Sequence, residues 1–260
     1  MTTAQPEKES MRVLGVRVDI VGIPQVVDAM TQWIERREER CRHIVNTGMH
    51  GIMVAHRDKS FKKILNSCDL FFPDGISVIW IAKLRGHRLR KKDTGPELLR
   101  EFCKMANGKG FSSYFYGDTD ETLSLLTDRL TTDFPDLKIA GSYSPPFREL
   151  TAEEDDEIVR NINASGADVL WVGLGCPRQE RWIYEHKDRL NIRIAVGVGA
   201  YFKFHSGQVK RAPGLIGNSG LEWLWRFVQE PRRMWRRVLI DGPQFVGHSL
   251  LELSGLRKYE

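Results

Sequence analysis

Apolar runs alternate with segments of helical periodicity along most of the chain, and the stretch 67–80 shows the change most clearly. Its apolar run ends at Pro73, because proline has no N–H group to give to a sheet. A turn at Asp74 and Gly75 follows, and apolar residues then return at helical spacing. The pattern predicts a strand, a turn and a helix, with an acidic side chain at the turn.

The same alternation recurs along the chain. Further strands are expected at 12–18, 42–45, 112–116, 137–143, 169–173 and 193–198. Further helices are expected at 24–36, 49–56, 61–65, 121–132, 151–165 and 178–190, and another begins at 93–96. Strands that alternate with helices predict an α/β fold with a Rossmann-like, doubly wound and mostly parallel sheet. We expect a disordered lead-in at 1–10, this core at 11–205, and a helical appendage rich in arginine and tryptophan at 206–260.

The composition is ordinary for a soluble protein, since 41% of the 260 residues are hydrophobic and 28% are charged. No run approaches the roughly 18 apolar residues that a membrane helix needs, and the polar N-terminus lacks the apolar core of a signal peptide. We therefore expect a cytoplasmic protein. The four cysteines lie far apart without a C-x-x-C pair, which argues against a disulfide framework or a zinc site. We expect them to be reduced and mostly buried.

Asp74 lies between the end of a predicted strand and the start of a helix. In an open α/β sheet, ligands bind at the carboxyl ends of the strands, so this carboxylate is a candidate for chemistry. An aspartate at such a junction also caps the helix through its side-chain oxygen. Taken alone, the pattern favours the cap, and the residues at the other strand ends shift the balance toward a ligand site.

Three other predicted strand ends carry glycines. Gly117 precedes Asp118 at one of them, and the stretches 172–180 and 197–202 contain two glycines each. Glycine lets a backbone approach a ligand, and free N–H groups at a helix start favour an anion. Several such ends on one edge of a sheet indicate a diphosphate-bearing ligand. Because Arg178 stands where the third glycine of G-x-G-x-x-G would be, and no Walker lysine motif is present, we expect neither a dinucleotide clamp nor a P-loop.

The segment 220–237 combines three tryptophans with five arginines. Trp223, Phe227 and Trp235 can share one apolar surface while the arginines present a cationic face. Such a combination suits a membrane interface or a site for anionic lipid and phosphate groups. Two other interpretations stay open: a helix pair packed on the core with solvated arginines, and a nucleic-acid surface. No nucleic-acid-binding motif accompanies the segment, so we do not expect a nucleic-acid partner.

In combination, these motifs resemble those of the WecG/TagA/CpsF glycosyltransferases, from about residue 13 to about residue 245. The resemblance rests on Pro73-Asp74-Gly75, Thr94-Gly95, 172–180, Gly197-Val-Gly, 207–213 and 220–233. It implies an inverting transfer of an N-acetylmannosamine-type sugar from a UDP-sugar to a polyprenyl-diphosphate-linked acceptor, in the synthesis of a cell-surface polysaccharide. It also implies that the reaction uses no cofactor and no metal.

The same resemblance assigns roles to individual residues. Asp74 matches an acid proposed as the general base, which would deprotonate the acceptor hydroxyl. Gln179, the second catalytic candidate, matches a glutamine near the sugar and the diphosphate. The arginines of the appendage match a segment thought to close over the site, to stabilise the leaving UDP as a metal does elsewhere, and to dock on the membrane. The remaining substrate-binding candidates are Asn46, Thr47, Lys92, Thr94, Gly117, Asp118, Gly173, Gly175, Arg178, Gly197, Gly199, Arg226, Arg232 and Arg233.

Three departures from the family pattern leave the donor sugar open. Many members have T-x-N where this chain has Asn46-Thr47-Gly48, Lys92 replaces an arginine, and Lys203 replaces the aspartate of F-D-F. Lysine keeps the charge of arginine but not its bidentate fork. The expected protein is an enzyme attached peripherally to the inner face of the cell membrane, and a homo-oligomer stays open. The main alternative is a catalytically silent UDP-sugar-binding partner in polysaccharide assembly.

Overall fold

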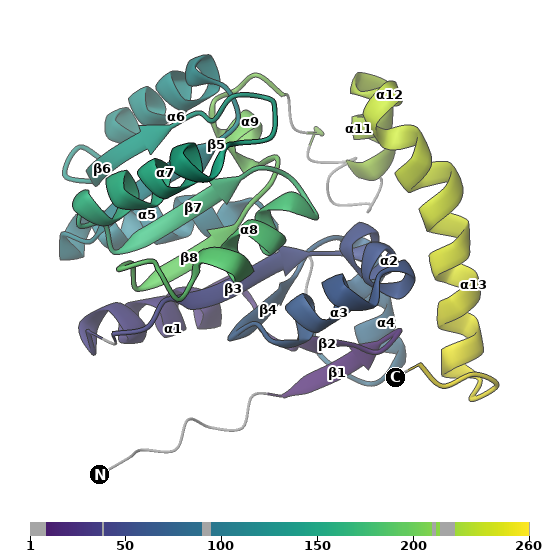
Figure 1. Ribbon diagram of the computed structural model, residues 1–260. Helices are drawn as coiled ribbons and strands as arrows, with labels where there is room; N and C mark the ends of the chain where they lie inside the picture. The colour runs from purple at the N-terminus through teal and green to yellow at the C-terminus, as the bar shows by residue number, and fades with distance from the viewer. Residues whose placement is uncertain (1–8, 38, 90–94, 210–211, 214–221, 260) are drawn as a thin grey trace, which may run out of the picture. The chain divides into compact units, whose positions relative to one another are not determined.

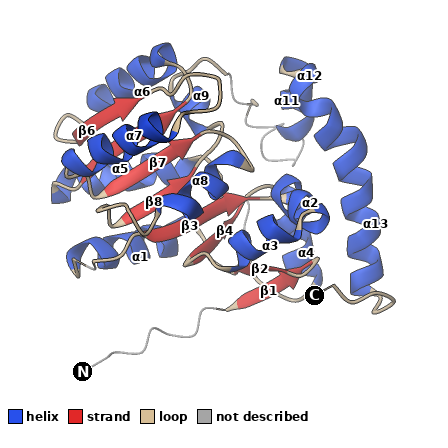
Figure 2. Cartoon of the chain, viewed as in Figure 1, coloured by secondary structure: helices blue, strands red, loops and turns tan. Residues whose placement is uncertain are grey.

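The computed structural model describes residues 9–37, 39–89, 95–209, 212–213 and 222–259. It contains a six-stranded sheet in the order β4-β3-β8-β7-β5-β6 (Figure 1 and Figure 2). Its strands are β3 (Arg42–Thr47), β4 (Leu70–Pro73), β5 (Ser112–Gly117), β6 (Lys138–Tyr143), β7 (Val169–Gly173) and β8 (Ile194–Gly197). The pairs β3–β8, β8–β7, β7–β5 and β5–β6 are parallel, which confirms the predicted α/β fold with a mostly parallel sheet.

The chain divides into two compact units, each built from segments that are distant in sequence. Unit 1 comprises 1–22, 46–95 and 211–260, and unit 2 comprises 23–45 and 96–210. The expected lead-in lies almost wholly outside the described residues. The boundary expected at 205 stays a prediction.

Unit 2 covers both faces of its strands with helices. These are α1 (Ile23–Glu35), α5 (Glu97–Lys109), α6 (Asp120–Asp133), α7 (Ala152–Ala164), α8 (Arg178–His186) and the short α9 (Tyr201–His205). Successive side chains of a strand point to opposite faces. Leu170 of β7 packs in one core cluster with Ile158 of α7 and Ile183 of α8. The next residue, Trp171, packs edge-on against Phe102 of α5, with ring centroids 5.4 Å apart.

Unit 1 begins with an antiparallel hairpin of β1 (Ser10–Val13) and β2 (Val16–Asp19), where the sequence predicts a single strand at 12–18. The turn consists of Leu14 and Gly15, whose φ angles of 50° and 80° fit a two-residue hairpin turn. Leu14 is apolar and fully buried, so the hydrophobic pattern continues through the turn and conceals it.

Apart from β4 and the end of β3, the remaining described elements of unit 1 are helices. These are α2 (Met49–Arg57), α3 (Lys59–Asn66), α4 (Ile76–Leu84), α11 (Glu222–Gln229), α12 (Pro231–Arg236), the π-helical turn η2 (Arg237–Asp241) and α13 (Gly242–Leu253). They confirm that the C-terminal segment is helical. The four cysteines form no disulfide among the described residues. Three of them are buried, as the sequence predicts.

Two carboxylates hold the C-terminal helices within unit 1. Asp241 is 3% exposed; it accepts a hydrogen bond from Arg57 Nη2 at 2.6 Å and lies 2.9 Å from His50 Nδ1. Burial raises the pKa of the Asp241 carboxyl group, but the hydrogen bonds from His50 and Arg57 outweigh it and leave the pKa below its ordinary value. Near the other end of α13, Glu252 accepts from Arg85 Nη2 at 2.7 Å. Charged hydrogen bonds therefore anchor α13 at both ends.

We expect Asp241→Asn to lower the free energy of unfolding by about 2 kcal/mol at pH 7, because Arg57 and His50 lose a buried charged acceptor. Urea unfolding followed by circular dichroism measures this change. Gln244→Ala is the matched control: Gln244 accepts from the same guanidinium at 2.6 Å but is exposed, so its loss should cost less than about 0.5 kcal/mol. Equal effects of the two variants would contradict the anchoring role of Asp241.

Candidate active site

In unit 1, the ends of β3 and β4 bring three of the predicted site residues together. The N–H of Asp74, directly after β4, donates to the carbonyl oxygen of Thr47 at the end of β3, at 3.0 Å. Asn46 and Thr47 belong to β3, which continues two residues beyond the strand predicted at 42–45. Both are buried, and Asn46 Nδ2 donates to the carbonyl oxygen of Phe72 at 3.3 Å. This bond gives the polar side chain a partner inside the sheet, so the strand continues through it.

Asp74 itself is half-buried, and glycines line its backbone and its carboxylate. A Cβ at Gly48 would lie 2.0 Å from the carbonyl oxygen of Asp74, so only glycine fits there. A Cβ at Gly95 would lie 3.5 Å from Asp74 Oδ1, which places that backbone beside the carboxylate. The N-cap residue of α4 is Gly75, so Asp74 does not occupy the capping position that the alternative interpretation gives it. The candidates Lys92 and Thr94 lie outside the described residues.

In unit 2, the strands β5, β7 and β8 all end in glycine, and Gly117 is paired with Gly173. The space around each glycine explains why. A Cβ would lie 2.7 Å from the Gly173 carbonyl carbon at Gly117, 2.5 Å from the Phe202 ring at Gly173, and 2.8 Å from Gln179 Nε2 at Gly197. Packing inside unit 2 therefore requires all three glycines. That their backbones also approach a ligand stays a prediction.

Gln179 joins the turns that follow β7 and β8. Its side chain is buried, and Oε1 accepts from the N–H of Gly175 at 3.1 Å and from the N–H of Gly199 at 2.9 Å. Nε2 donates to Glu180 Oε1 at 2.9 Å. Gly175 has a φ of 80°, which disfavours any residue with a side chain even though the space beside it is open. The glutamine predicted as catalytic thus also connects two turns through hydrogen bonds.

Glu180 is a residue that the sequence analysis misses. It is fully buried, burial raises the pKa of its carboxyl group to about 7, and Oε2 makes no hydrogen bond within the described part of the chain. A glutamate in the first turn of a helix ordinarily reads as a surface residue that complements the helix dipole. The available signal is spacing: Gln179 and Glu180 precede the buried Ile183 by four and three residues, on one helix face.

Arg178 is the first residue of α8 and is exposed. No hydrogen bond or ion pair joins its side chain to another residue that the structure describes. The helix dipole disfavours a cation at this end, and a bound anion would relieve the conflict. Its contact with a ligand stays a prediction.

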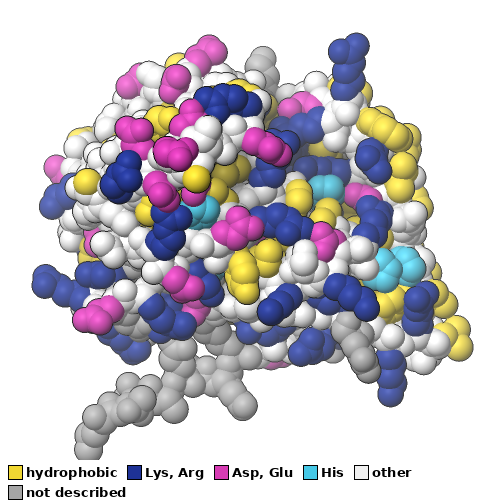
Figure 3. Space-filling view, in the orientation of Figure 1, with side chains coloured by type: hydrophobic (Ala, Val, Ile, Leu, Met, Phe, Trp, Pro, Cys, Tyr) yellow, Lys and Arg dark blue, Asp and Glu magenta, His cyan; other side chains and the backbone are white. Residues whose placement is uncertain are grey.

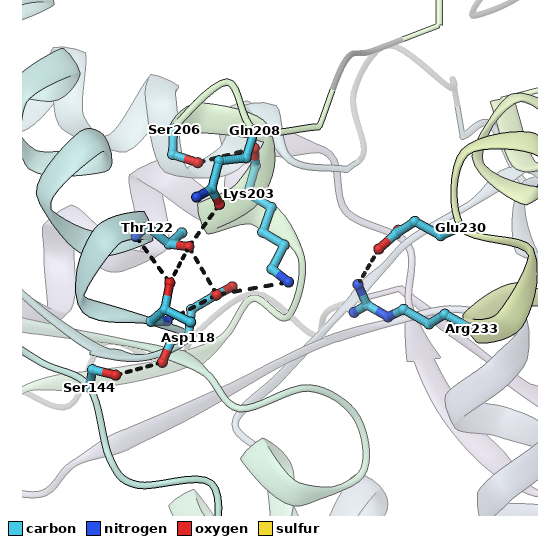
Figure 4. A network of polar contacts seen from close by, with 9 residues as sticks. Asp118, Thr122, Ser144, Lys203, Ser206, Gln208, Glu230 and Arg233 are labelled. Atoms are coloured by element: carbon cyan, nitrogen blue, oxygen red, sulfur yellow. Dashed lines mark hydrogen bonds and ion pairs between the residues drawn. The ribbon is translucent and has the colours of Figure 1, made fainter.

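The loop after β5 is held by Asp118, whose φ of 57° is uncommon for a residue other than glycine (Figure 4). Its Oδ1 accepts from the Thr119 N–H at 3.0 Å and lies 3.1 Å from the Thr122 hydroxyl group. The Ser144 hydroxyl group donates to the Asp118 carbonyl oxygen at 2.8 Å. Lys203 Nζ lies 3.9 Å from the same carboxylate. These contacts show that Asp118 stabilises the loop. Lys203, whose side chain is 36% exposed, is the more solvent-accessible charged group beside it.

The three appendage arginines among the site candidates, Arg226, Arg232 and Arg233, lie on α11 and α12. Arg232 and Arg233 are exposed, and Arg233 Nη1 pairs with Glu230 Oε1 at 3.1 Å. Trp223 and Trp235 are 42% and 46% exposed. Apolar side chains continue the exposed surface along α13 (Figure 3); they are Val246, Leu250, Leu251, Leu253 and, just beyond the helix, Leu256. Across the described ranges, no helix combines the length and apolar character needed to span a membrane.

The raised pKa of Glu180 has a consequence for stability. An unfolded glutamate ionises near its ordinary value of 4.5, whereas the folded one holds its proton to about pH 7. The unfolded state therefore binds fewer protons between these values, and stability falls as pH rises through this window. We expect Glu180→Gln to gain stability relative to the wild type as pH rises from 4 to 8, by up to about 3 kcal/mol.

Urea unfolding of both proteins across this pH range measures the difference. Glu185→Gln is the control, because Glu185 lies on the same helix but is exposed, and its difference from the wild type should stay nearly constant. A difference for Glu180→Gln that does not change with pH would show that the carboxyl group titrates alike in the folded and unfolded states.

Comparisons with known proteins place these features in a family. The model of the glycosyl transferase WecG/TagA/CpsF family matches residues 11–259. Two relatives bear the name N-acetylglucosaminyldiphosphoundecaprenol N-acetyl-beta-D-mannosaminyltransferase. The one from Bacillus spizizenii is 34% identical over 185 residues, which cover 71% of this chain and 70% of the relative. The one from Bacillus subtilis is 27% identical over 229 residues, which cover 85% and 86%.

Among solved structures, a nicotinate phosphoribosyltransferase from Vibrio cholerae aligns with 73% of this chain and 48% of its own, at 12% identity. Its TM-score of 0.22 is too low to support an argument. The family model, by contrast, spans nearly the whole chain and includes every candidate residue named above. The chain therefore belongs to the WecG/TagA/CpsF family of glycosyl transferases.

Proposed function

We propose that this enzyme transfers N-acetylmannosamine from a UDP-sugar to an N-acetylglucosamine carried by a polyprenyl diphosphate, as a step in building a cell-surface polysaccharide. The names of the relatives from the two Bacillus species support this donor sugar and acceptor. The observation that carries the proposal is the place of the half-buried Asp74, whose backbone N–H donates to Thr47 at the carboxyl ends of β3 and β4. In an α/β sheet this is the edge at which ligands bind.

In the proposed reaction, Asp74 is the general base. Its carboxylate takes the proton of the acceptor hydroxyl group as that oxygen attacks the anomeric carbon. The bond from the anomeric carbon to the diphosphate breaks, and its electron pair leaves with UDP. Attack and departure on opposite faces of the sugar invert the anomeric configuration. The donor diphosphate is assigned to the turns after β7 and β8 in unit 2, which Gln179 ties together.

The leaving UDP needs positive charge, which we assign to arginines rather than to a metal ion. Arg226 and Arg232 lie on α11 and α12, and Arg178 is exposed at the start of α8. Guanidinium groups bind phosphate oxygens in a bidentate manner, and placed donors stabilise charge that develops as the glycosidic bond breaks. Arg233 forms an ion pair with Glu230, so we expect it to contribute less to stabilising the leaving UDP.

We also propose that the enzyme works at the inner face of the cell membrane, where a polyprenyl-linked acceptor resides. Exposed Trp223 and Trp235 lie near the exposed arginines of α12 in sequence, and apolar side chains continue along α13. Tryptophan and arginine together suit the boundary between headgroups and acyl chains. Association of two copies through this apolar surface stays open.

We expect Asp74→Asn to lower acceptor-dependent UDP release by about 10²- to 10³-fold while UDP still binds, because the amide cannot accept the proton. The assay uses a UDP-N-acetylmannosamine donor and a short-chain lipid-diphosphate N-acetylglucosamine acceptor, and NMR of the product reports the anomeric configuration. Asp136→Asn, an exposed acid, serves as the control. Full activity of Asp74→Asn would remove the base from the mechanism, and UDP binding without release by the wild type would favour a silent binding protein.

For the membrane, we expect Arg232→Glu/Arg236→Glu to weaken binding to phosphatidylglycerol vesicles at least tenfold, since each basic residue near an anionic surface contributes about 1 kcal/mol. Vesicle sedimentation measures the binding. Lys104→Glu/Arg160→Glu makes the same change in net charge at exposed positions of α5 and α7 and should bind like the wild type. Equal losses in both double variants would mean that net charge, rather than the appendage, decides binding.

A further inference from the structure

The carboxamide of Gln179 can occupy its site in two orientations that exchange oxygen for nitrogen. In one, Oε1 accepts from the N–H groups of Gly175 and Gly199, at 3.1 Å and 2.9 Å. In the other, the NH₂ group would face both N–H donors, and two hydrogen bonds would be lost. The turns after β7 and β8 are therefore joined only while the first orientation holds.

The group on the other side of the carboxamide also distinguishes the two orientations. Glu180 Oε1 accepts from Gln179 Nε2 at 2.9 Å, and the Glu180 side chain is fully buried. Reversal would bring Gln179 Oε1 against Glu180 Oε1, and two acceptor oxygens repel each other whether the carboxyl group is ionised or carries its proton on Oε2. A buried amide N–H that loses its acceptor is costly as well. The carboxyl group therefore penalises the reversed orientation.

We propose that Glu180 is a positioning residue of this enzyme: its carboxyl oxygen fixes the Gln179 carboxamide, and through it the relative placement of the Gly175 and Gly199 backbones. This inference rests on the proposed function in that the two turns are assigned to the donor diphosphate. Glu180 touches no reacting atom and acts only through Gln179. Both the neutral and the ionised carboxyl group offer an acceptor oxygen, so a glutamine at position 180 can supply the same contact.

Amide hydrogen exchange of the ligand-free protein, measured by NMR, tests the positioning without any assumption about substrate. Glu180→Met should speed exchange at Gly175 and Gly199 about tenfold, because the carboxamide loses the partner that fixes it. Glu180→Gln should restore most of the protection. The N–H of Gly110, which donates to Ala106 in unit 2, is the internal standard. Unchanged exchange in Glu180→Met, or no recovery in Glu180→Gln, would overturn the proposal.

A measurement on the wild type covers the case in which Glu180→Met does not fold. The carboxamide protons of Gln179, assigned by their absence from the spectrum of Gln179→Met, should exchange far more slowly than those of the exposed Gln244. Equal rates would show that the Gln179 carboxamide is not held, and the proposal would fail.

A double-mutant cycle on UDP affinity links the positioning to function. We expect Glu180→Met to weaken UDP binding about tenfold when Gln179 is present and less than about twofold in the Gln179→Met background, since Glu180 acts through that side chain. Glu185→Gln on the same helix is the control. Additive losses would overturn the proposal. A wild type that binds no UDP would refute the proposed function instead, and the exchange measurements would still decide the role of Glu180.

Discussion

Backbone N–H groups beyond the last paired residue of a parallel strand have no hydrogen-bond partner on a neighbouring strand. The need to supply them with other acceptors shapes unit 2. A buried N–H without an acceptor is costly, so such groups find partners in side chains or ligands. Here one oxygen atom, Oε1 of Gln179, accepts from Gly175 after β7 and from Gly199 after β8. Two adjacent turns thus depend on a single carboxamide. The conformations of both turns, and any ligand contact that they make, depend on how that group is held.

The glycines at these strand ends follow from the same close packing. Gly197 leaves room for the Gln179 carboxamide, Gly173 for the Phe202 ring, and Gly117 for the backbone of Gly173. A glycine-rich strand end that reads as a ligand-binding motif therefore has an internal cause as well. The two causes are compatible, because a backbone packed this closely has no side chain between it and a ligand. Packing alone accounts for the glycines, so the ligand must be demonstrated by other means.

The alternation of strands and helices was predictable because each element leaves a local signal in the sequence. These signals are the spacing of its hydrophobic residues and the residues that end a strand. The β1–β2 hairpin was not predictable, since Leu14 in its turn is as apolar as the strands beside it. Asp74 was predictable as a site candidate from its place after a strand. The burial of Glu180 was not, because a glutamate in a first helical turn looks like a surface residue, and only the packing of α8 on the sheet shows otherwise. The pattern of hydrophobic and polar residues does not reveal packing between elements that are distant in sequence.

Burying a carboxyl group as a hydrogen-bond acceptor costs considerable free energy if the group is ionised, because the charge loses its hydration. Burial raises the pKa of Glu180 to about 7, so below neutrality the group carries no charge and still offers an oxygen to Gln179. An apolar residue there would instead leave a buried amide N–H without its acceptor, at a cost of about 1–3 kcal/mol. Holding the Glu180 proton costs little below pH 4.5, where an unfolded glutamate is protonated as well, and the cost grows as the pH rises toward about 7 and levels off above it. The acid therefore holds the carboxamide at the lowest energetic cost in acidic solution.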